Sequence, residues 1–122
     1  MKKRILIVED NEENRRLLRD LFATTPHEIV EATTGDDGVA MVERARPDLV
    51  LMDIQLPGID GYEAIRRIRA KPELRRVPII AVTSYALSGD DRKALDAGAD
   101  AYVTKPFSSR QLLAKVREYL GS

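Results

Sequence analysis

Three short, uninterrupted apolar runs constrain the fold more than any other feature of the sequence. They are Ile5–Val8, Leu49–Met52 and Ile79–Val82, and each is rich in isoleucine, valine or leucine. Strands that are buried on both faces have this composition, because helices cover both sides of a parallel sheet. A membrane span would need about 20 apolar residues, far more than any of these runs offers. We therefore expect three central strands of a parallel sheet.

Two weaker strands and a set of helical patterns fill the intervals between these runs. Glu28–Ala32 mixes charged and apolar residues, as an edge strand does, and Ala101–Thr104 is short and half polar. The other intervals carry apolar residues at the three- and four-residue spacing of amphipathic helices. These predicted helices are Glu12–Thr25, Asp37–Arg46, Tyr62–Ala70, Asp90–Ala97 and Ser108–Leu120.

Strand and helix alternate along the whole chain, which predicts an α/β fold. We expect a doubly wound, five-stranded parallel sheet with five helices and right-handed crossovers. The common strand order for such a sheet is 2-1-3-4-5, and it places the charged strand Glu28–Ala32 at an edge. Because no linker, repeat or low-complexity segment interrupts the pattern, we expect a single domain over residues 1–122.

Charge and composition argue against several functional classes. The 20 basic and 20 acidic residues cancel, whereas a nucleic-acid-binding domain usually carries a basic excess. There is no cysteine, which excludes disulfides, thiolate metal sites and a cysteine nucleophile. The basic start Met1–Arg4 is followed by too short an apolar run for a secretory signal. We expect a cytoplasmic protein that binds neither nucleic acid nor a membrane.

Three further features receive ordinary structural interpretations. The basic run from Arg66 to Arg76 crosses the polar face and the exit of a helix, so we expect it to be solvated. His27 lies in a loop before the edge strand, where we expect a surface histidine without a phosphotransfer role. The glycines form no dinucleotide-binding or P-loop pattern, which leaves nucleotide binding without support.

Polar residues follow several predicted strands at one edge of the sheet. Ligands of such sheets bind outside the carboxyl ends of the strands, near the switch point between the first and third strands. The residues that follow the strands there are Glu9, Asp10, Asp53, Thr83, Thr104, Lys105 and Pro106. We expect them to open onto one site.

Carboxylates gathered at this edge would need a cation. A pair of carboxylates ~5 Å apart repels by about 3 kcal/mol at an effective dielectric constant of about 20. A hard divalent cation relieves the repulsion, and carboxylates with carbonyls and waters suit Mg²⁺. Lys105 adds a second positive charge. A carboxylate beside a cation, an ammonium group and a hydroxyl can accept a phosphoryl group as an aspartyl-phosphate.

Taken singly, each of these residues has a plain structural alternative. Asp10 can lead into a helix, and Asp53 can be a turn acid. Thr83 can be a β-branched strand end, Lys105 a solvated lysine and Tyr102 an amphipathic edge residue. Their convergence on adjacent strand ends favours a functional site.

A series of motifs at these positions resembles one known family. In order, they are Val8-Glu9-Asp10-Asn11, Leu51–Gly61, Val82-Thr83-Ser84, Gly98–Tyr102 and Lys105-Pro106-Phe107. Together they resemble the receiver domains of two-component response regulators, the CheY-like superfamily, over the whole chain. The resemblance implies a flavodoxin-like fold and a signalling switch that catalyses only its own phosphorylation and dephosphorylation.

The resemblance also implies roles for the residues at the acidic end of the site. Asp53 would be the phosphoacceptor. Asp10, Asp53 and the backbone carbonyl of Gln55 would bind Mg²⁺, and Glu9 would help through water.

A second group of residues would form the switch. Thr83 would hydrogen-bond the phosphoryl group after transfer, and Lys105 would pair with it. Tyr102 would move inward when Thr83 shifts, which converts a local charge into a changed surface. Pro106 would follow a cis peptide bond.

Partners follow from the same resemblance. The phosphodonor would be a phosphohistidine on a sensor histidine kinase or a phosphotransfer protein. A downstream effector protein would bind the face built from residues 90–97, 101–104 and 108–120. Receivers often pair through this face, and Leu87 and Tyr102 would lie there, so a weak homodimer stays open. Gln55 and Tyr85 lie at positions that tune the lifetime of the phosphoryl group, which the sequence does not reveal.

Two rival functions have weaker support. A flavin carrier needs a Ser/Thr/Gly-rich phosphate loop after the first strand, where this chain has the acidic segment Glu9–Glu13. A phosphatase of the haloacid dehalogenase class needs a second aspartate as general acid, where this chain has Gln55.

Within the family, more than one setting is open. We expect a single-domain response regulator, because only Gly121-Ser122 follow the last predicted helix. The alternatives are a receiver from a hybrid histidine kinase or larger response regulator, and a binding module that works without phosphorylation. The segment Thr83–Asp91 is similar both to stand-alone receivers of the DivK type and to hybrid-kinase receivers.

Overall fold

The computed structural model describes residues 2–83 and 90–121 and contains a five-stranded parallel sheet. Its strands are β1 (Arg4–Val8), β2 (Glu28–Ala32), β3 (Leu49–Asp53), β4 (Ile79–Thr83) and β5 (Ala101–Thr104). The helices are α1 (Glu12–Phe22), α2 (Gly35–Ala45), α3 (Gly61–Arg69), α4 (Asp90–Ala97) and α5 (Ser109–Leu120), with a short 3₁₀ helix, η1, at Pro72–Leu74.

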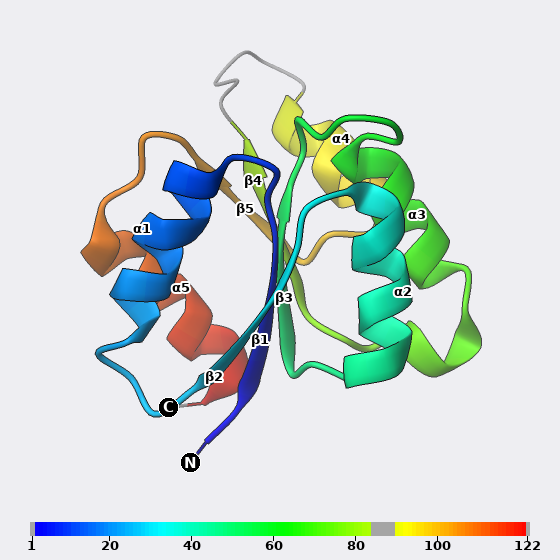
Figure 1. The fold of residues 1–122 in the computed structure, drawn as a ribbon. Coiled ribbons are helices and arrows are strands. Elements are labelled where there is room, and N and C mark those ends of the chain that lie inside the picture. Colours follow the sequence, from blue (N-terminus) through cyan, green and yellow to red (C-terminus); the bar gives the residue numbers. More distant parts are fainter. Residues whose placement is uncertain (1, 84–89, 122) are drawn as a thin grey trace.

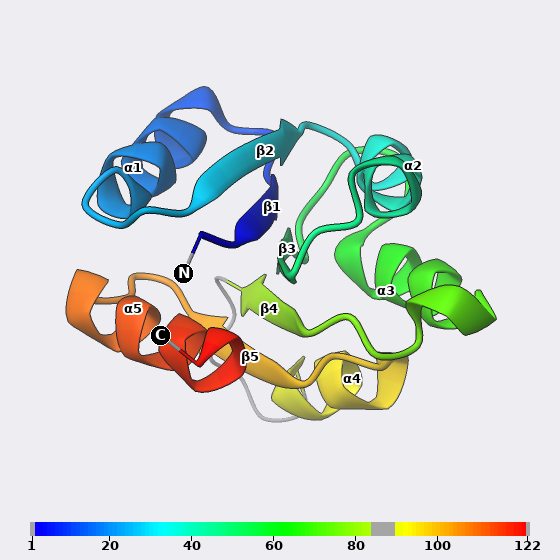
Figure 2. The same cartoon turned by 90° about the horizontal axis from the view of Figure 1, so that it is seen from below.

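Helices cover both faces of the sheet (Figures 1 and 2). α1 and α5 lie side by side on one face, and α2, α3 and α4 lie on the other. The strands are ordered β2-β1-β3-β4-β5 and all pair in parallel. This confirms the predicted doubly wound fold with order 2-1-3-4-5, whose switch point lies between β1 and β3.

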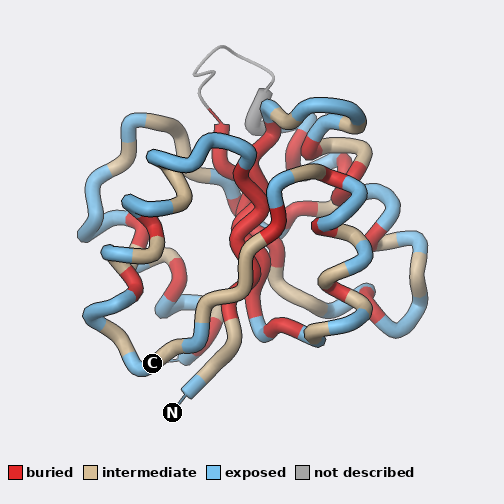
Figure 3. Tube along the Cα trace, viewed as in Figure 1, coloured by how far each residue is buried: buried red, intermediate tan, exposed pale blue. Residues whose placement is uncertain are grey.

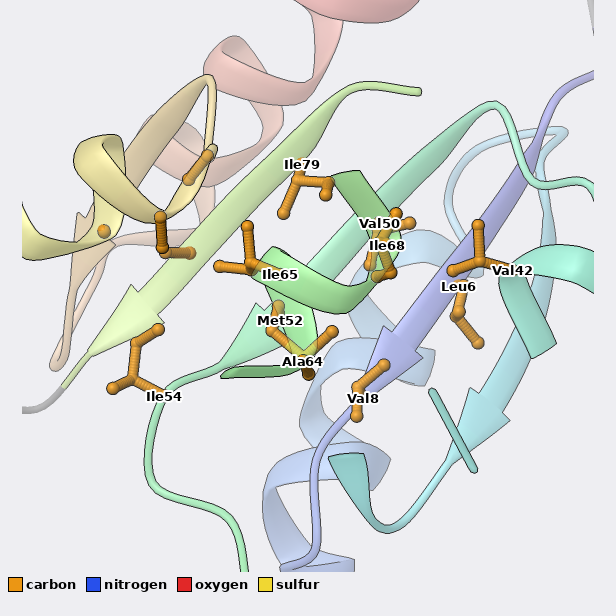
Figure 4. Packing of buried hydrophobic residues seen from close by; sticks show 14 of the residues in the cluster. Leu6, Val8, Val42, Val50, Met52, Ile54, Ala64, Ile65, Ile68 and Ile79 are labelled. Atoms are coloured by element: carbon orange, nitrogen blue, oxygen red, sulfur yellow. The ribbon is translucent and has the colours of Figure 1, made fainter. Parts of the chain in front are cut away.

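The central strands are buried as their composition predicts (Figure 3). Every residue of β3 and β4 is buried, whereas β2 buries only Ala32, which confirms its edge position. On one face, a single buried hydrophobic cluster includes Leu6 of β1, Met52 of β3 and Ile65 of α3 (Figure 4). Full burial of such a side chain contributes about 1.5–3 kcal/mol, so the sheet forms a firm base for its loops.

Several helix ends differ from the predicted ones because of side-chain capping. α1 ends at Phe22 rather than Thr25, and the Thr25 hydroxyl donates to the Phe22 carbonyl at 2.6 Å. α2 begins at Gly35 rather than Asp37, because Thr34 caps it and accepts a hydrogen bond from the Asp37 amide at 3.0 Å. Periodicity locates the body of a helix, but hydroxyl groups set its ends.

The predicted solvated basic face is wrong for one of its members. The Arg69 side chain is largely buried and donates to the carbonyl oxygens of Val77 and Gly98 at 2.7 and 2.8 Å. It also pairs with Asp100 at 2.9 Å, and that carboxylate accepts the backbone N–H of Ile79 at 2.8 Å. Arg69 therefore ties the segments that enter β4 and β5 together, because five donors on one guanidinium can serve several carbonyls.

His27 lies before β2, at the opposite end of the sheet from the residues that follow β1 and β3. Its Nδ1 accepts a hydrogen bond from the Lys3 amide at 3.1 Å, and burial lowers its pKa. No helix within residues 2–83 and 90–121 is both long enough and apolar enough to cross a membrane.

Candidate functional site

Three carboxylates meet at the carboxyl edge of the sheet. Val8 of β1 pairs with Met52 of β3, so the residues that follow these two positions emerge side by side. Carboxylate oxygens of Glu9, Asp10 and Asp53 all lie within 4.8 Å of one another. Glu9 and Asp53 are only 2% and 4% exposed, whereas Asp10 faces solvent. Two of the three acids are therefore held together out of water.

Lys105 reaches these acids from the loop between β5 and α5. Its Nζ lies 2.9 Å from a carboxylate oxygen of Glu9 and 3.4 Å from one of Asp53. The Lys105 amide donates to the Thr83 carbonyl at 2.7 Å, which anchors the loop to the end of β4. The peptide bond between Lys105 and Pro106 is cis. The site thus combines groups from both ends of the sequence.

Burial and crowding shift the ionisation of these groups. Burial, followed by interaction with Glu9, raises the pKa of Asp53 to about 7. Burial alone would raise the pKa of Glu9, but hydrogen bonds with Asp53, Lys105 and the Asn11 amide outweigh it and lower that pKa. The pKa of Lys105 is raised, because the two carboxylates outweigh the effect of its burial. Of this pair, Glu9 therefore ionises before Asp53.

The donor set fits a hard divalent cation. Three carboxylates face one ammonium group, which leaves excess negative charge in a partly buried place. All of the available donors are oxygens, which Mg²⁺ prefers, and no cysteine exists in the chain to favour a softer metal.

Three other residues predicted for the site, Thr83, Gln55 and Tyr102, lie on β4, just after β3 and on β5. Thr83 is buried at the end of β4, one position past Val82, the strand partner of Asp53. The backbone N–H of Gln55 donates to an Asp53 carboxylate oxygen at 3.0 Å. Tyr102 lies on β5 with 39% of its surface exposed, on the outside of the molecule. The predictions about Ser84, Tyr85 and Leu87 fall on residues outside the described ones.

Sequence reasoning missed the role of Gly61, the first residue of α3. Its amide donates to the Ile54 carbonyl at 2.9 Å. A Cβ atom at this position would lie 2.3 Å from the Asp53 carbonyl oxygen and 2.6 Å from Cα of Ile54. α3 therefore begins in direct contact with the backbone of Asp53. The signal was an Asp60-Gly61 pair before an amphipathic pattern, with Asp60 as the cap that bonds the Glu63 amide at 2.9 Å.

Comparison with known proteins gives a consistent result. The family model of the response regulator receiver domain matches residues 5–117. The polar-differentiation response regulator DivK of Brucella anthropi is 40% identical over 121 residues, which cover 99% of this chain and 98% of that protein.

Solved structures are similar over the full length of the chain. The receiver domain of a sensor histidine kinase from Pseudomonas aeruginosa is 39% identical, has a TM-score of 0.92 and covers 100% of both chains. It holds a magnesium ion in its active-site cleft. A putative response regulator from Chloroflexus aurantiacus is 28% identical, with a TM-score of 0.94 and 100% coverage of both chains.

Proposed function

This chain belongs to the response regulator receiver domain family, and we propose that it accepts a phosphoryl group on Asp53 in the presence of Mg²⁺. The observation that carries the proposal is the buried pair Glu9 and Asp53, with Asp10 and Lys105 beside it. A receiver is a signalling switch, so the phosphoryl group acts as a signal rather than as an intermediate in the turnover of a separate substrate.

In the proposed reaction, a carboxylate oxygen of Asp53 attacks the phosphorus of the donor. A P–O bond forms to Asp53, and the bond between phosphorus and its leaving group breaks, with the electron pair going to the leaving group. The leaving group is imidazole from phosphohistidine, or acetate from acetyl phosphate. The backbone N–H of Gln55 donates to Oδ1 of Asp53 at 3.0 Å and holds the carboxylate in a fixed orientation. Lys105 offsets negative charge on the transferring group.

The cation would be held by Asp10, Asp53 and the backbone carbonyl of Gln55, with Glu9 acting through water. When bound, Mg²⁺ would neutralise the carboxylates and the oxygens of the transferring phosphoryl group. The acidic cluster and the magnesium-bound receiver from Pseudomonas aeruginosa support this part of the proposal.

The switch would begin at Thr83 and end at Tyr102. Phosphorylation adds about −1.5 to −2 charges at Asp53 and several acceptor oxygens. The Thr83 hydroxyl, at the end of the neighbouring strand, would hydrogen-bond the new group, and Tyr102 would turn inward in response. Pro106 would hold the loop that carries Lys105. Tyr102 is exposed, so the proposed inward turn would begin from an outward-facing position.

The changed surface would be read on the face formed by α4, β5 and α5. These elements are neighbours in Figure 2, and residues such as Leu95, Tyr102 and Pro106 line a groove between them. We place the effector there, with weak homodimer formation through the same face as a second use. The donor would be a sensor histidine kinase or a phosphotransfer protein, and the chain itself would work in the cytoplasm, as expected for a relative of DivK.

The proposed chemistry predicts Mg²⁺-dependent addition of one phosphoryl group. Incubation with acetyl phosphate, followed by intact mass spectrometry, should show a single adduct with Mg²⁺ and none after chelation. The flavin-carrier and phosphorylation-independent alternatives predict no such adduct, whereas a phosphatase would show steady turnover of a phosphate ester. Absence of an adduct with both acetyl phosphate and a phosphohistidine donor would contradict the proposal.

Lys105→Ala should separate metal binding from phosphoryl transfer. Because the variant loses the ammonium group that neutralises the transferring phosphoryl group, we expect adduct formation at saturating Mg²⁺ to slow by about 100-fold. Mg²⁺ affinity should be unchanged or higher, since a competing cation has gone. In wild type, phosphorylation should change hydrogen exchange around Tyr102, and in the variant this change should be lost.

The matched control for this prediction is Lys115→Ala, which removes a lysine of α5 that pairs with Glu118 at 3.8 Å. It should behave as wild type in all three measurements, which are the rate of adduct formation, the Mg²⁺ affinity and the change in hydrogen exchange around Tyr102. A normal rate and a normal change around Tyr102 in Lys105→Ala would remove this lysine from the switch.

A further inference from the structure

Arg15 is a charged side chain with several partners close to the acids. It lies in the first turn of α1, the helix that follows the loop after β1 (Figure 1 shows the two elements). Its side chain is only 13% exposed, which is low for an arginine on a surface helix. A guanidinium that is taken this far out of water needs partners with a defined geometry.

Arg15 binds backbone groups of the loop between β1 and α1, residues 9–11, which we call the acidic loop. Nη1 donates to the Glu9 carbonyl oxygen at 2.9 Å and to the Asp10 carbonyl oxygen at 3.0 Å. These are the two consecutive residues whose side chains face Asp53. A hydrogen bond at each of two consecutive carbonyls restricts the rotation of the peptide unit between them, and that rotation sets where the two side chains point.

The Arg15 guanidinium is itself held in place by two further acids. Nε of Arg15 lies 3.3 Å from Glu31 of β2, and the guanidinium also pairs with Glu12. The Glu9 amide donates to the Ala32 carbonyl at 3.0 Å, so β2 holds the same loop from a second side. The acidic loop is therefore clamped between α1 and the edge strand, and Arg15 is the connecting side chain.

We propose that Arg15 is a positioning residue for the Mg²⁺ site: by binding the carbonyl oxygens of Glu9 and Asp10, it orients the two acids toward Asp53. This inference rests on the proposed function, since it assigns Arg15 a part in that same site. Residues that orient metal ligands commonly change metal affinity by about 10–100-fold when they are removed.

Arg19 provides a matched control on the same helix. It pairs with the same two acids as Arg15, with Glu31 at 2.8 Å and with Glu12 at 2.9 Å. Within the described part of the chain, the side-chain hydrogen bonds of Arg19 go to these carboxylates and not to the acidic loop. Arg19→Ala and Arg15→Ala therefore remove the same charge from the same network, but only Arg15→Ala releases the loop.

Charge and positioning predict effects of opposite sign. Loss of a positive charge near an anionic site should strengthen the binding of a cation. Loss of a clamp should weaken it, because the acids then spend part of their time in orientations that do not bind. We expect Arg15→Ala to raise the dissociation constant for Mg²⁺ by about tenfold, and Arg19→Ala to change it by less than about twofold.

The test is isothermal titration of Mg²⁺ into wild type and the Arg15→Ala, Arg15→Lys and Arg19→Ala variants. Arg15→Lys keeps the charge but has a compact ammonium group in place of the planar fork, so we expect an intermediate affinity. It also serves if Arg15→Ala does not fold. In the Arg15 variants, adduct formation from acetyl phosphate should be slow at low Mg²⁺ concentration. At saturating Mg²⁺ it should approach the wild-type rate, because the chemistry at Asp53 is intact.

Weaker Mg²⁺ binding in the Arg15 variants than in Arg19→Ala supports the inference. Equal or tighter binding, with normal binding by wild type, overturns the role of Arg15 and leaves the proposed function standing. Failure of wild type to bind Mg²⁺ overturns the proposed function and, with it, the role of Arg15.

Discussion

Asp53→Asn is expected to abolish the phosphoryl adduct and, in metal-free protein at neutral pH, to raise the stability of the fold. The adduct is lost because an amide oxygen does not attack phosphorus as a carboxylate does. Stability rises because the variant no longer holds a second negative charge against Glu9 in a buried site, where burial and Glu9 raise the pKa of Asp53 to about 7.

The stability effect should depend on pH with a defined sign. The pKa of Asp53 is higher in the folded chain, about 7, than the ordinary value of 3.8. Between these values the folded state binds a proton that the unfolded state releases, so the stabilisation present in acid is lost as pH rises to about 7. The advantage of Asp53→Asn should therefore grow over this range and reach about 1–3 kcal/mol above it.

Urea unfolding of metal-free protein at several pH values, together with intact mass after acetyl phosphate treatment, measures both effects. The control is Asp20→Asn, which changes an exposed acid of α1. It should leave both the adduct and the pH dependence of the free energy of unfolding unchanged. Added Mg²⁺ should stabilise wild type more than Asp53→Asn, since the variant lacks one proposed ligand. A normal adduct in Asp53→Asn, or a stability loss at every pH, would contradict the assignment.

Gly61→Ala should destabilise the fold by about 3 kcal/mol or more. The new Cβ would meet the Asp53 carbonyl oxygen at 2.3 Å and Cα of Ile54 at 2.6 Å. Both contacts are with backbone, so no side chain can turn away to relieve them. Either α3 or the end of β3 must move, and either movement displaces Asp53. The fraction that folds should therefore also bind Mg²⁺ more weakly.

Gly58→Ala is the control for backbone strain alone. Gly58 lies in the loop that precedes α3, with φ of +76°, and a Cβ there would meet nothing within 4 Å. It should cost about 1 kcal/mol, from the left-handed conformation only. Thermal and urea unfolding of both variants give the comparison. Equal destabilisation of Gly61→Ala and Gly58→Ala would show that the close approach of α3 to β3 carries no energetic weight.

The fold was largely predictable because its main determinants are local. The apolar runs in β1, β3 and β4 have no polar residue to support another interpretation, and mixed composition marked β2 as the edge. The order of the strands followed from general rules of handedness and packing. Helix ends were less predictable, since Thr25 and Thr34 decide them through single hydroxyl groups.

The acidic residues of the site could be predicted from the sequence, but the arginines that hold the surrounding backbone could not. Parallel strands bring their carboxyl ends to one edge, so Glu9, Asp10 and Asp53 could be placed together from spacing alone. Arg15 acts through carbonyl groups of other residues, and so does Arg69. A carbonyl group is present at every position, so the sequence carries no mark of which one a distant arginine will bind.

Locating the phosphoryl group on the chain would test the proposed mechanism most directly. After incubation with acetyl phosphate and Mg²⁺, borohydride reduces an acyl phosphate to an alcohol and converts the aspartate that carried it into homoserine. Peptide sequencing by mass spectrometry then finds that position. The mechanism predicts homoserine at position 53 in the presence of Mg²⁺ and unmodified aspartate there without it. Homoserine at position 10, or a phosphoryl group on a threonine or on His27 instead, would contradict it.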